Sequence, residues 1–193
     1  KPEKRKTNKP MNFLGGKSQV RHFPKGIIGI ISPWNLPFGL TVAPLTSALA
    51  AGNRALLKPS EFVPETGALF SEVVPKYFPK DEVAVVTGGA DISQRFAELP
   101  FDHLLFTGSS NIGAKVMQSA SKNLVPVTLE LGGKSPVIIG RSAQLDLAGT
   151  RLTFGKLLNG GQLCLSPDYV VVPNELEEQL IARVVQEAQS CYE

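Results

Sequence analysis

Short apolar segments alternate with longer segments of helical periodicity along most of this chain, and this alternation constrains the fold more than any other feature. The predicted strands are 26–31, 55–58, 83–86, 103–106 and 127–129, and the predicted helices between them are 40–51, 64–77, 92–98 and 112–120. Strands that alternate with helical crossovers form a parallel sheet covered by helices on both faces. The pattern therefore predicts an α/β domain.

The pattern restarts after Gly132-Gly133, which indicates a second unit. There we predict strands at 137–139 and 169–172 and helices at 145–158 and 176–189. These few elements cannot form a complete hydrophobic core by themselves. Residues 132–193 are therefore expected to begin a second α/β domain. Residues 1–22 form a polar, basic arm, with a predicted hairpin over 11–22 around Gly15-Gly16. The first domain then covers 23–131.

Composition excludes several classes of protein. The net charge is only +3 and the basic N-terminal run has no interleaved aromatic residues, so nucleic-acid binding is not expected. The longest apolar stretch, 40–51, is too short and too interrupted to cross a bilayer. Two cysteines cannot build a secreted disulfide framework, which favours a reducing, cytoplasmic compartment. No metal-ligand motif is present.

Four motifs carry candidate chemistry, and each also has a purely structural interpretation. Phe106–Gly113 (FTGSSNIG) follows a strand and opens a helix, where phosphate binds well, although it fails as a literal G-x-G-x-x-G match and could be a turn without a ligand. Cys164 in GQLC is a nucleophile candidate or a small buried apolar residue. Glu130 ends a strand before two glycines, and Asn35 lies in a proline-rich turn, where either residue could be structural.

Taken in order, the motifs resemble the aldehyde dehydrogenase family. The matching stretches are PWNLPF (33–38), AGNRALLKPSE (51–61), FTGSSNIG (106–113), VPVTLELGGKSP (125–136) and GQLC (161–164). The resemblance covers nearly all of the chain from about Val20 onward, and VPVTLELGGKSP with the SPDY after Cys164 is most similar to the class 3 branch. It implies a Rossmann-like dinucleotide-binding domain over 23–131 and the start of the catalytic domain over 132–193.

The resemblance also implies an activity and three catalytic residues. A thiolate at Cys164 would attack an aldehyde to give a thiohemiacetal whose oxyanion expels hydride to a nicotinamide. The Asn35 amide and the backbone N–H of Cys164 would donate to that oxyanion. Glu130 would activate water against the resulting thioester. The branch implies an aromatic substrate, such as coniferyl aldehyde, or a medium-to-long aliphatic aldehyde.

The implied cofactor is NAD, with NADP usable but poorer. The Glu61 carboxylate would accept from both ribose hydroxyls and would repel an additional phosphate, while Lys58 opposes that repulsion. Ser109 and the helix that it opens would hold the pyrophosphate, with Gly108 and Gly113 permitting close backbone approach. The other implied cofactor contacts are Ile31, Ser32, Pro33, Trp34, Ser60, Gly89, Ile112, Leu131 and Gly132.

The chain also departs from the family pattern, and more than one function stays open. Ser166 stands where the family usually has alanine, and the family's downstream E-x-F-G-P motif lies outside this sequence. We therefore expect less than half of a complete member, which would be a homo-oligomer. The alternative to an active enzyme segment is a non-catalytic nucleotide-binding fragment. A CoA-acylating dehydrogenase is a third option, which Glu130 disfavours.

Overall fold

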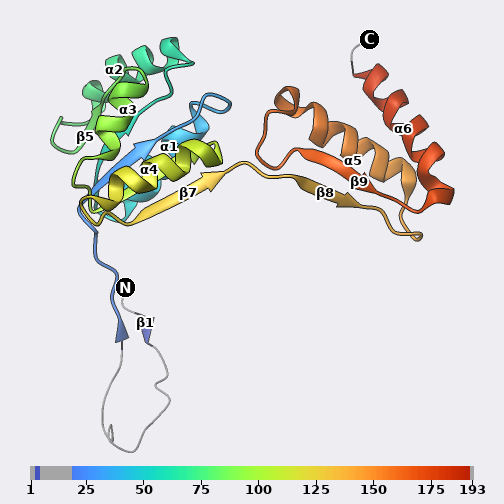
Figure 1. The fold of residues 1–193 in the computed structure, drawn as a ribbon, viewed down its shortest axis with the longest axis horizontal. Helices are drawn as coiled ribbons and strands as arrows, with labels where there is room; N and C mark the ends of the chain where they lie inside the picture. The colour runs from blue at the N-terminus through green and yellow to red at the C-terminus, as the bar shows by residue number, and fades with distance from the viewer. Residues whose placement is uncertain (1–2, 5–18, 192–193) are drawn as a thin grey trace, which may run out of the picture.

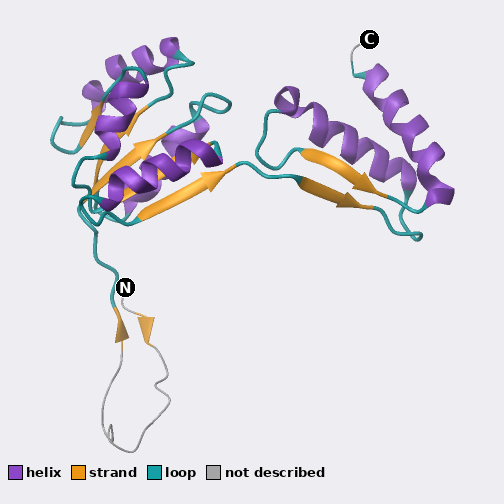
Figure 2. Cartoon of the chain, viewed as in Figure 1, coloured by secondary structure: helices purple, strands orange, loops and turns teal. Residues whose placement is uncertain are grey.

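The chain folds into two lobes, each with a parallel sheet. A computed structural model describes residues 3–4 and 19–191. We call residues 20–131 the first lobe and residues 132–191 the second lobe. Figure 1 shows the two lobes joined by the extended connection from β7 to β8, with the N-terminal arm leaving the first lobe. Figure 2 shows that both lobes mix helices with strands.

Five parallel strands form the sheet of the first lobe. They are β3 (Ile27–Ile31), β4 (Arg54–Lys58), β5 (Val83–Val85), β6 (His103–Gly108) and β7 (Val127–Leu131). Their order in the sheet is β5-β4-β3-β6-β7, and every neighbouring pair is parallel. This order, in which the chain starts in the middle and winds first to one side and then to the other, is that of a Rossmann sheet. The predicted Rossmann-like α/β fold is confirmed.

Helices cover both faces of this sheet. α1 (Gly39–Ala50) and α2 (Pro64–Tyr77) pack with Ile28 and Ile30 of β3 in one buried cluster. α3 (Ala90–Ala97) and α4 (Ser110–Ser121) pack with Ile31 and Phe106 in a second cluster on the other face. Successive side chains of a strand point to opposite faces, which is why Ile30 and Ile31 belong to different clusters. A strand buried on both faces must be continuously apolar, as the sequence of β3 is.

Asn53 ties the end of α1 to the start of β3. Its Oδ1 accepts from the backbone N–H groups of Lys25 and Gly26 at 2.6 and 3.0 Å, and its Nδ2 donates to the Ala48 carbonyl at 3.1 Å. Asn53 therefore fixes where the central strand begins relative to the end of α1.

The second lobe is smaller and leaves much apolar surface open. β8 (Ser135–Ile138) and β9 (Pro167–Val171) pair in parallel, α5 (Leu145–Leu157) packs beside this pair, and α6 (Glu177–Ser190) packs against α5 (Figure 1). Two short 3-10 turns, η2 (Leu158–Gly161) and η3 (Asn174–Leu176), complete it. Among its described apolar residues only Ile139 and Leu180 are buried. Two strands and two helices bury too little surface for an independent core.

The predicted elements of both lobes are present, with boundaries shifted by at most two residues. The shift that matters is at β6 and β7, which extend to Gly108 and Leu131, so Glu130 lies one residue before the end of its strand. The predicted hairpin over 11–22 lies mostly outside the described residues. Its described end, β2 (Gln19–Val20), pairs antiparallel with β1 (Glu3–Lys4).

Within residues 3–4 and 19–191, no helix has both the length and the apolar character needed to cross a membrane.

Candidate functional site

The carboxyl ends of the first-lobe strands meet at one edge and bring the predicted motifs together. Ile31 at the end of β3 is in register with Lys58 of β4 and Phe106 of β6, and Gly108 is in register with Leu131. The winding direction reverses between β3 and β6. Ligands of open α/β sheets bind outside the carboxyl ends of the strands at such a reversal. The segments that follow β3, β4, β6 and β7 therefore define a candidate site.

Asn35 lies in the turn from β3 to α1, and buried hydrogen bonds hold this turn in place. Thr41 in the first turn of α1 is fully buried, and its hydroxyl lies 2.6 Å from Ser32 Oγ and 2.6 Å from the Pro37 carbonyl oxygen. The Ser32 N–H donates to the Lys58 carbonyl at 3.2 Å. Ser32 and Pro33 are buried, whereas Trp34 is 47% exposed, so the turn presents a large ring to the solvent.

The Cys164 loop from the second lobe lies against this turn. Asn35 Nδ2 donates to the Gln162 carbonyl at 2.7 Å, and Asn159 Nδ2 donates to the Asn35 carbonyl at 2.8 Å. A Cβ on Gly133 would lie 3.5 Å from the Cys164 carbonyl oxygen, so the connection between the lobes also passes beside this loop. Cys164 is exposed. An exposed thiol next to a turn that carries an amide donor is open to a substrate.

Glu130 is also exposed, near the end of β7 and in register with Thr107 of β6. The connection that begins two residues later passes beside the Cys164 loop at Gly133. Leu131 is half-buried and Gly132 is exposed along the same segment. The carboxylate therefore lies on the same sheet edge as the Asn35 turn and is accessible to water.

The Ser109 segment forms the amino end of α4. Ser109 is the N-cap residue, and its Oγ accepts from the Ile112 N–H at 3.4 Å. The first-turn N–H groups of a helix have no intrahelical acceptor and carry its positive dipole end, so they favour a phosphate. The capping serine keeps its own O–H as a further donor. Ile112 is 45% exposed beside this end.

The two glycines of this segment have a packing role that the sequence analysis did not predict. A Cβ on Gly113 would lie 2.9 Å from Leu131 Cδ2, and a Cβ on Gly108 would lie 2.5 Å from the Phe106 ring. Gly113 therefore lets α4 lie close to β6 and β7, whereas Gly108 leaves room for the Phe106 ring of its own strand.

Lys58 and Glu61 lie where β4 leaves the sheet. Lys58 is fully buried, with its Nζ 2.8 Å from the Pro59 carbonyl oxygen and 3.4 Å from Glu61 Oε2. The Glu61 side chain is 34% exposed and keeps further lone pairs for a ligand. A buried ammonium that holds a carboxylate at the surface restricts the orientation of that carboxylate.

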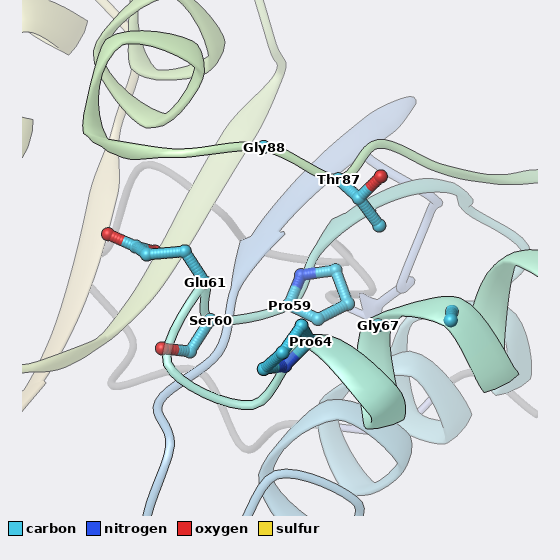
Figure 3. Close-up of a pocket in the computed structure, with 8 residues that line it drawn as sticks. Pro59, Ser60, Glu61, Pro64, Gly67, Thr87 and Gly88 are labelled. Atoms are coloured by element: carbon cyan, nitrogen blue, oxygen red, sulfur yellow. The ribbon is translucent and has the colours of Figure 1, made fainter.

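A hollow of about 250 Å³ opens beside Glu61. Figure 3 shows Thr87 and Gly88 across from Pro59, Pro64 and Gly67, with Glu61 and Ser60 on the segment after β4. Its lining residues are Pro59, Ser60, Glu61, Pro64, Gly67, Ala68, Thr87 and Gly88. This volume is below the range of roughly 300–1,000 Å³ that holds a complete drug-sized ligand, and it suits one part of a dinucleotide. Gly89, a predicted contact, follows Gly88 and caps α3.

Neither histidine belongs to this edge. His103 begins β6 at the opposite end of the sheet, and its Nε2 lies 2.8 Å from Thr128 Oγ1. Burial, followed by the charge of Lys25, lowers the pKa of His103 from its usual value of 6.5. His22 is exposed in the segment before β3. In the part of the chain that the structure describes, no three His, Cys, Asp or Glu side chains gather where they could hold a metal ion.

Two residues that shape the site were missed by the sequence analysis. Thr41 shares a helical face with Leu45 and Ala48, and all three are buried, so a hydroxyl on that face was a signal for a buried hydrogen bond. Asn159 precedes Gly160-Gly161, a run typical of left-handed turns. No sequence pattern indicated that the Asn159 side chain would contact Asn35 in the other lobe.

Comparison with known proteins identifies the family. The model of the aldehyde dehydrogenase family matches residues 3–192. A probable coniferyl aldehyde dehydrogenase from Caulobacter vibrioides is 52% identical over 182 residues, which are 94% of this chain and 38% of that protein. The chain thus spans well under half the length of the relative that it matches. The class 3-like resemblance is confirmed as well.

Solved structures agree with this assignment. The structure of AldH from Staphylococcus aureus in a substrate-bound state has a TM-score of 0.92 and 40% identity, covering 100% of this chain and 42% of that one. An aldehyde dehydrogenase from Mycobacterium tuberculosis complexed with NAD⁺ has a TM-score of 0.85 and 33% identity, covering 98% and 38%. The family match over residues 3–192 and the shared fold lead to one conclusion: this chain belongs to the aldehyde dehydrogenase family.

Proposed function

We propose that the protein containing this chain oxidises an aldehyde to its carboxylic acid with a nicotinamide dinucleotide, through a covalent intermediate on Cys164. The observation that carries the proposal is the 2.7 Å hydrogen bond from Asn35 Nδ2 to the Gln162 carbonyl, between residues 127 positions apart. It holds an amide donor beside the loop of the exposed cysteine. A nucleophile next to a preorganised donor is the arrangement that addition to a carbonyl requires.

The chemistry of this edge fits the cofactor. The amino end of α4 suits the pyrophosphate, and the Glu61 carboxylate beside the hollow suits a ribose diol. Bound NAD⁺ would supply the hydride acceptor. We propose NAD as the preferred cofactor and NADP as a poorer one, because an additional phosphate would meet the negative charge of Glu61. The buried Lys58 already contacts Glu61 at 3.4 Å, so it offsets the repulsion only in part.

The residues of this chain then act in sequence. The Cys164 sulfur adds to the aldehyde carbon, and the carbonyl electron pair moves to oxygen, which gives a thiohemiacetal oxyanion. The Asn35 N–H and the Cys164 backbone N–H donate to that oxyanion. Loss of hydride from the same carbon leaves a thioester.

Hydrolysis of the thioester needs a base. Glu130 takes a proton from water as the water adds to the thioester carbon, and the C–S bond breaks to release the acid and the Cys164 thiolate. The exposure of Glu130 supports this role, since the base must be accessible to water. We further propose an aromatic aldehyde or a medium-to-long aliphatic aldehyde as the substrate, on the strength of the similarity to a probable coniferyl aldehyde dehydrogenase.

The test uses the two cysteines of this chain, both of which are exposed. In the full-length protein, Cys164→Ala should abolish aldehyde oxidation while leaving NAD⁺ affinity, measured by fluorescence titration, near that of the wild type. Cys191→Ala is the matched control and should keep wild-type turnover. Retention of most turnover by the Cys164 variant would rule out the covalent mechanism.

A further inference from the structure

The loop that precedes Cys164 has an uncommon backbone. Asn159 and Gly160 in η2 have φ of 52° and 63°, and Gly161 continues the run with φ of 76°. Left-handed backbone is easy for glycine, and asparagine is among the few other residues that tolerate it. Conformation alone would thus be satisfied by a third glycine at position 159. The side chain of Asn159 therefore needs an explanation other than backbone conformation.

That side chain belongs to a closed circuit of hydrogen bonds. Asn159 Nδ2 donates to the Asn35 carbonyl at 2.8 Å, and Asn35 Nδ2 donates to the Gln162 carbonyl at 2.7 Å. Gln162 returns two bonds to the Asn159 carbonyl, one from its Nε2 at 2.9 Å and one from its backbone N–H at 3.2 Å. Each of the three residues is therefore held by the other two.

The circuit determines which way the Asn35 amide faces. A primary amide has two N–H groups. The Gln162 carbonyl takes one of them, which fixes the amide plane and leaves the second N–H for another acceptor. The Asn159 bond to the Asn35 carbonyl restrains the same residue at its backbone. A donor held in advance of the reaction stabilises an oxyanion without a reorganisation cost.

We propose that Asn159 is a positioning residue that orients Asn35, an inference that rests on the proposed role of Asn35 as the oxyanion donor. Asn159 lies in the second lobe and Asn35 in the first. The hydrogen bond between them therefore also fixes the position of one lobe relative to the other at the point where Cys164 and Asn35 must meet. Asn159 does not touch the substrate.

The experiment compares two replacements at position 159 in the full-length protein. Asn159→Gly keeps the left-handed backbone and removes the side-chain donor. Asn159→Asp keeps a residue that tolerates the conformation but presents a carboxylate to the Asn35 carbonyl. Both should lower kcat by about 10-fold to 100-fold with NAD⁺ affinity unchanged, because a misplaced donor costs rate and not cofactor binding. Asn123→Gly is the matched control, since Asn123 Nδ2 makes a similar 2.7 Å bond to the Glu98 carbonyl away from the site.

A double variant separates positioning from a general structural role. If Asn159 acts through the Asn35 amide, Asn35→Ala combined with Asn159→Gly should have a kcat within about twofold of Asn35→Ala alone, because residues that act as one unit are not additive. Alkylation of Cys164 by iodoacetamide without cofactor, followed by mass spectrometry of its peptide, should keep the wild-type rate in Asn159→Gly. Multiplicative losses in kcat, or a severalfold change in alkylation, would overturn the inference.

The single variants distinguish this inference from the proposed function. If Cys164→Ala and Asn35→Ala lose turnover while Asn159→Gly keeps it, the inference fails and the proposed function stands. If Cys164→Ala keeps turnover, the proposed function fails. If Asn35→Ala alone has no effect on kcat, Asn35 is not the oxyanion donor and the inference falls with that assignment.

Discussion

The buried hydroxyl of Thr41 allows a stability prediction to be worked out from the structure. Thr41 Oγ1 lies 2.6 Å from both Ser32 Oγ and the Pro37 carbonyl oxygen. Thr41→Val keeps the branched shape and removes both contacts. A net hydrogen bond contributes about 1 kcal/mol, and a buried group left without a partner adds a similar penalty, so opening of the Asn35 turn should become easier by about 2 kcal/mol.

Thr46 of the same helix provides a matched control. Its Oγ1 donates to the Val42 carbonyl at 2.8 Å, a bond to the residue four positions earlier, as in Thr41, but Thr46 is exposed. Water replaces that bond when it is lost, so Thr46→Val should change stability by no more than about 0.5 kcal/mol. The pair therefore compares a buried hydroxyl that has two partners with an exposed hydroxyl that has one.

Hydrogen–deuterium exchange of the full-length protein measures this opening locally. The reporters are the Ser32 N–H, bonded to the Lys58 carbonyl at 3.2 Å, and the Leu40 N–H, bonded to the Leu36 carbonyl at 2.9 Å. A change of 2 kcal/mol corresponds to about 30-fold faster exchange of peptides from this turn. We expect about twofold or less for Thr46→Val. Equal acceleration in the two variants, or none in Thr41→Val, would refute the argument that these bonds hold the turn.

Three further predictions concern charged or titratable groups. If Glu130 is the deacylating base, Glu130→Gln should keep a burst of NADH in the first turnover and then release acid slowly, whereas loss of the burst would assign Glu130 to the first half-reaction. Glu61→Gln should raise kcat/KM with NADP relative to NAD, and wild-type protein that uses both equally would contradict the proposed preference. The pKa of His103 is lowered from 6.5 by burial, so the unfolded state binds more protons. The contribution of His103 to stability should be complete above about pH 6.5 and be lost as the pH falls toward the lowered value. Urea titrations across this range should show a shallower pH dependence in His103→Gln, and an unchanged slope would assign the pH dependence elsewhere.

Much of the architecture could be predicted because its causes are local. Apolar periodicity located the strands β3 to β9 and the α-helices of both lobes, because the spacing of apolar residues in each element shows which face it buries. In the parallel sheet the carboxyl ends of the strands share an edge, which brings the segments after Ile31, Lys58 and Gly108 together. The family was evident in the order of the motifs, and the comparison confirmed it.

The tertiary structure decided how these pieces contact one another. The amide of Asn35 meets Gln162 across 127 positions, and Asn159 closes the circuit, because the second lobe folds back onto the β3–α1 turn. The close contact between Gly113 and the Leu131 side chain likewise exists only in the folded sheet. Sequence patterns record which face of an element is buried, but they do not record which distant side chain meets it. Such contacts depend on the packing of whole elements, so only the folded chain determines them.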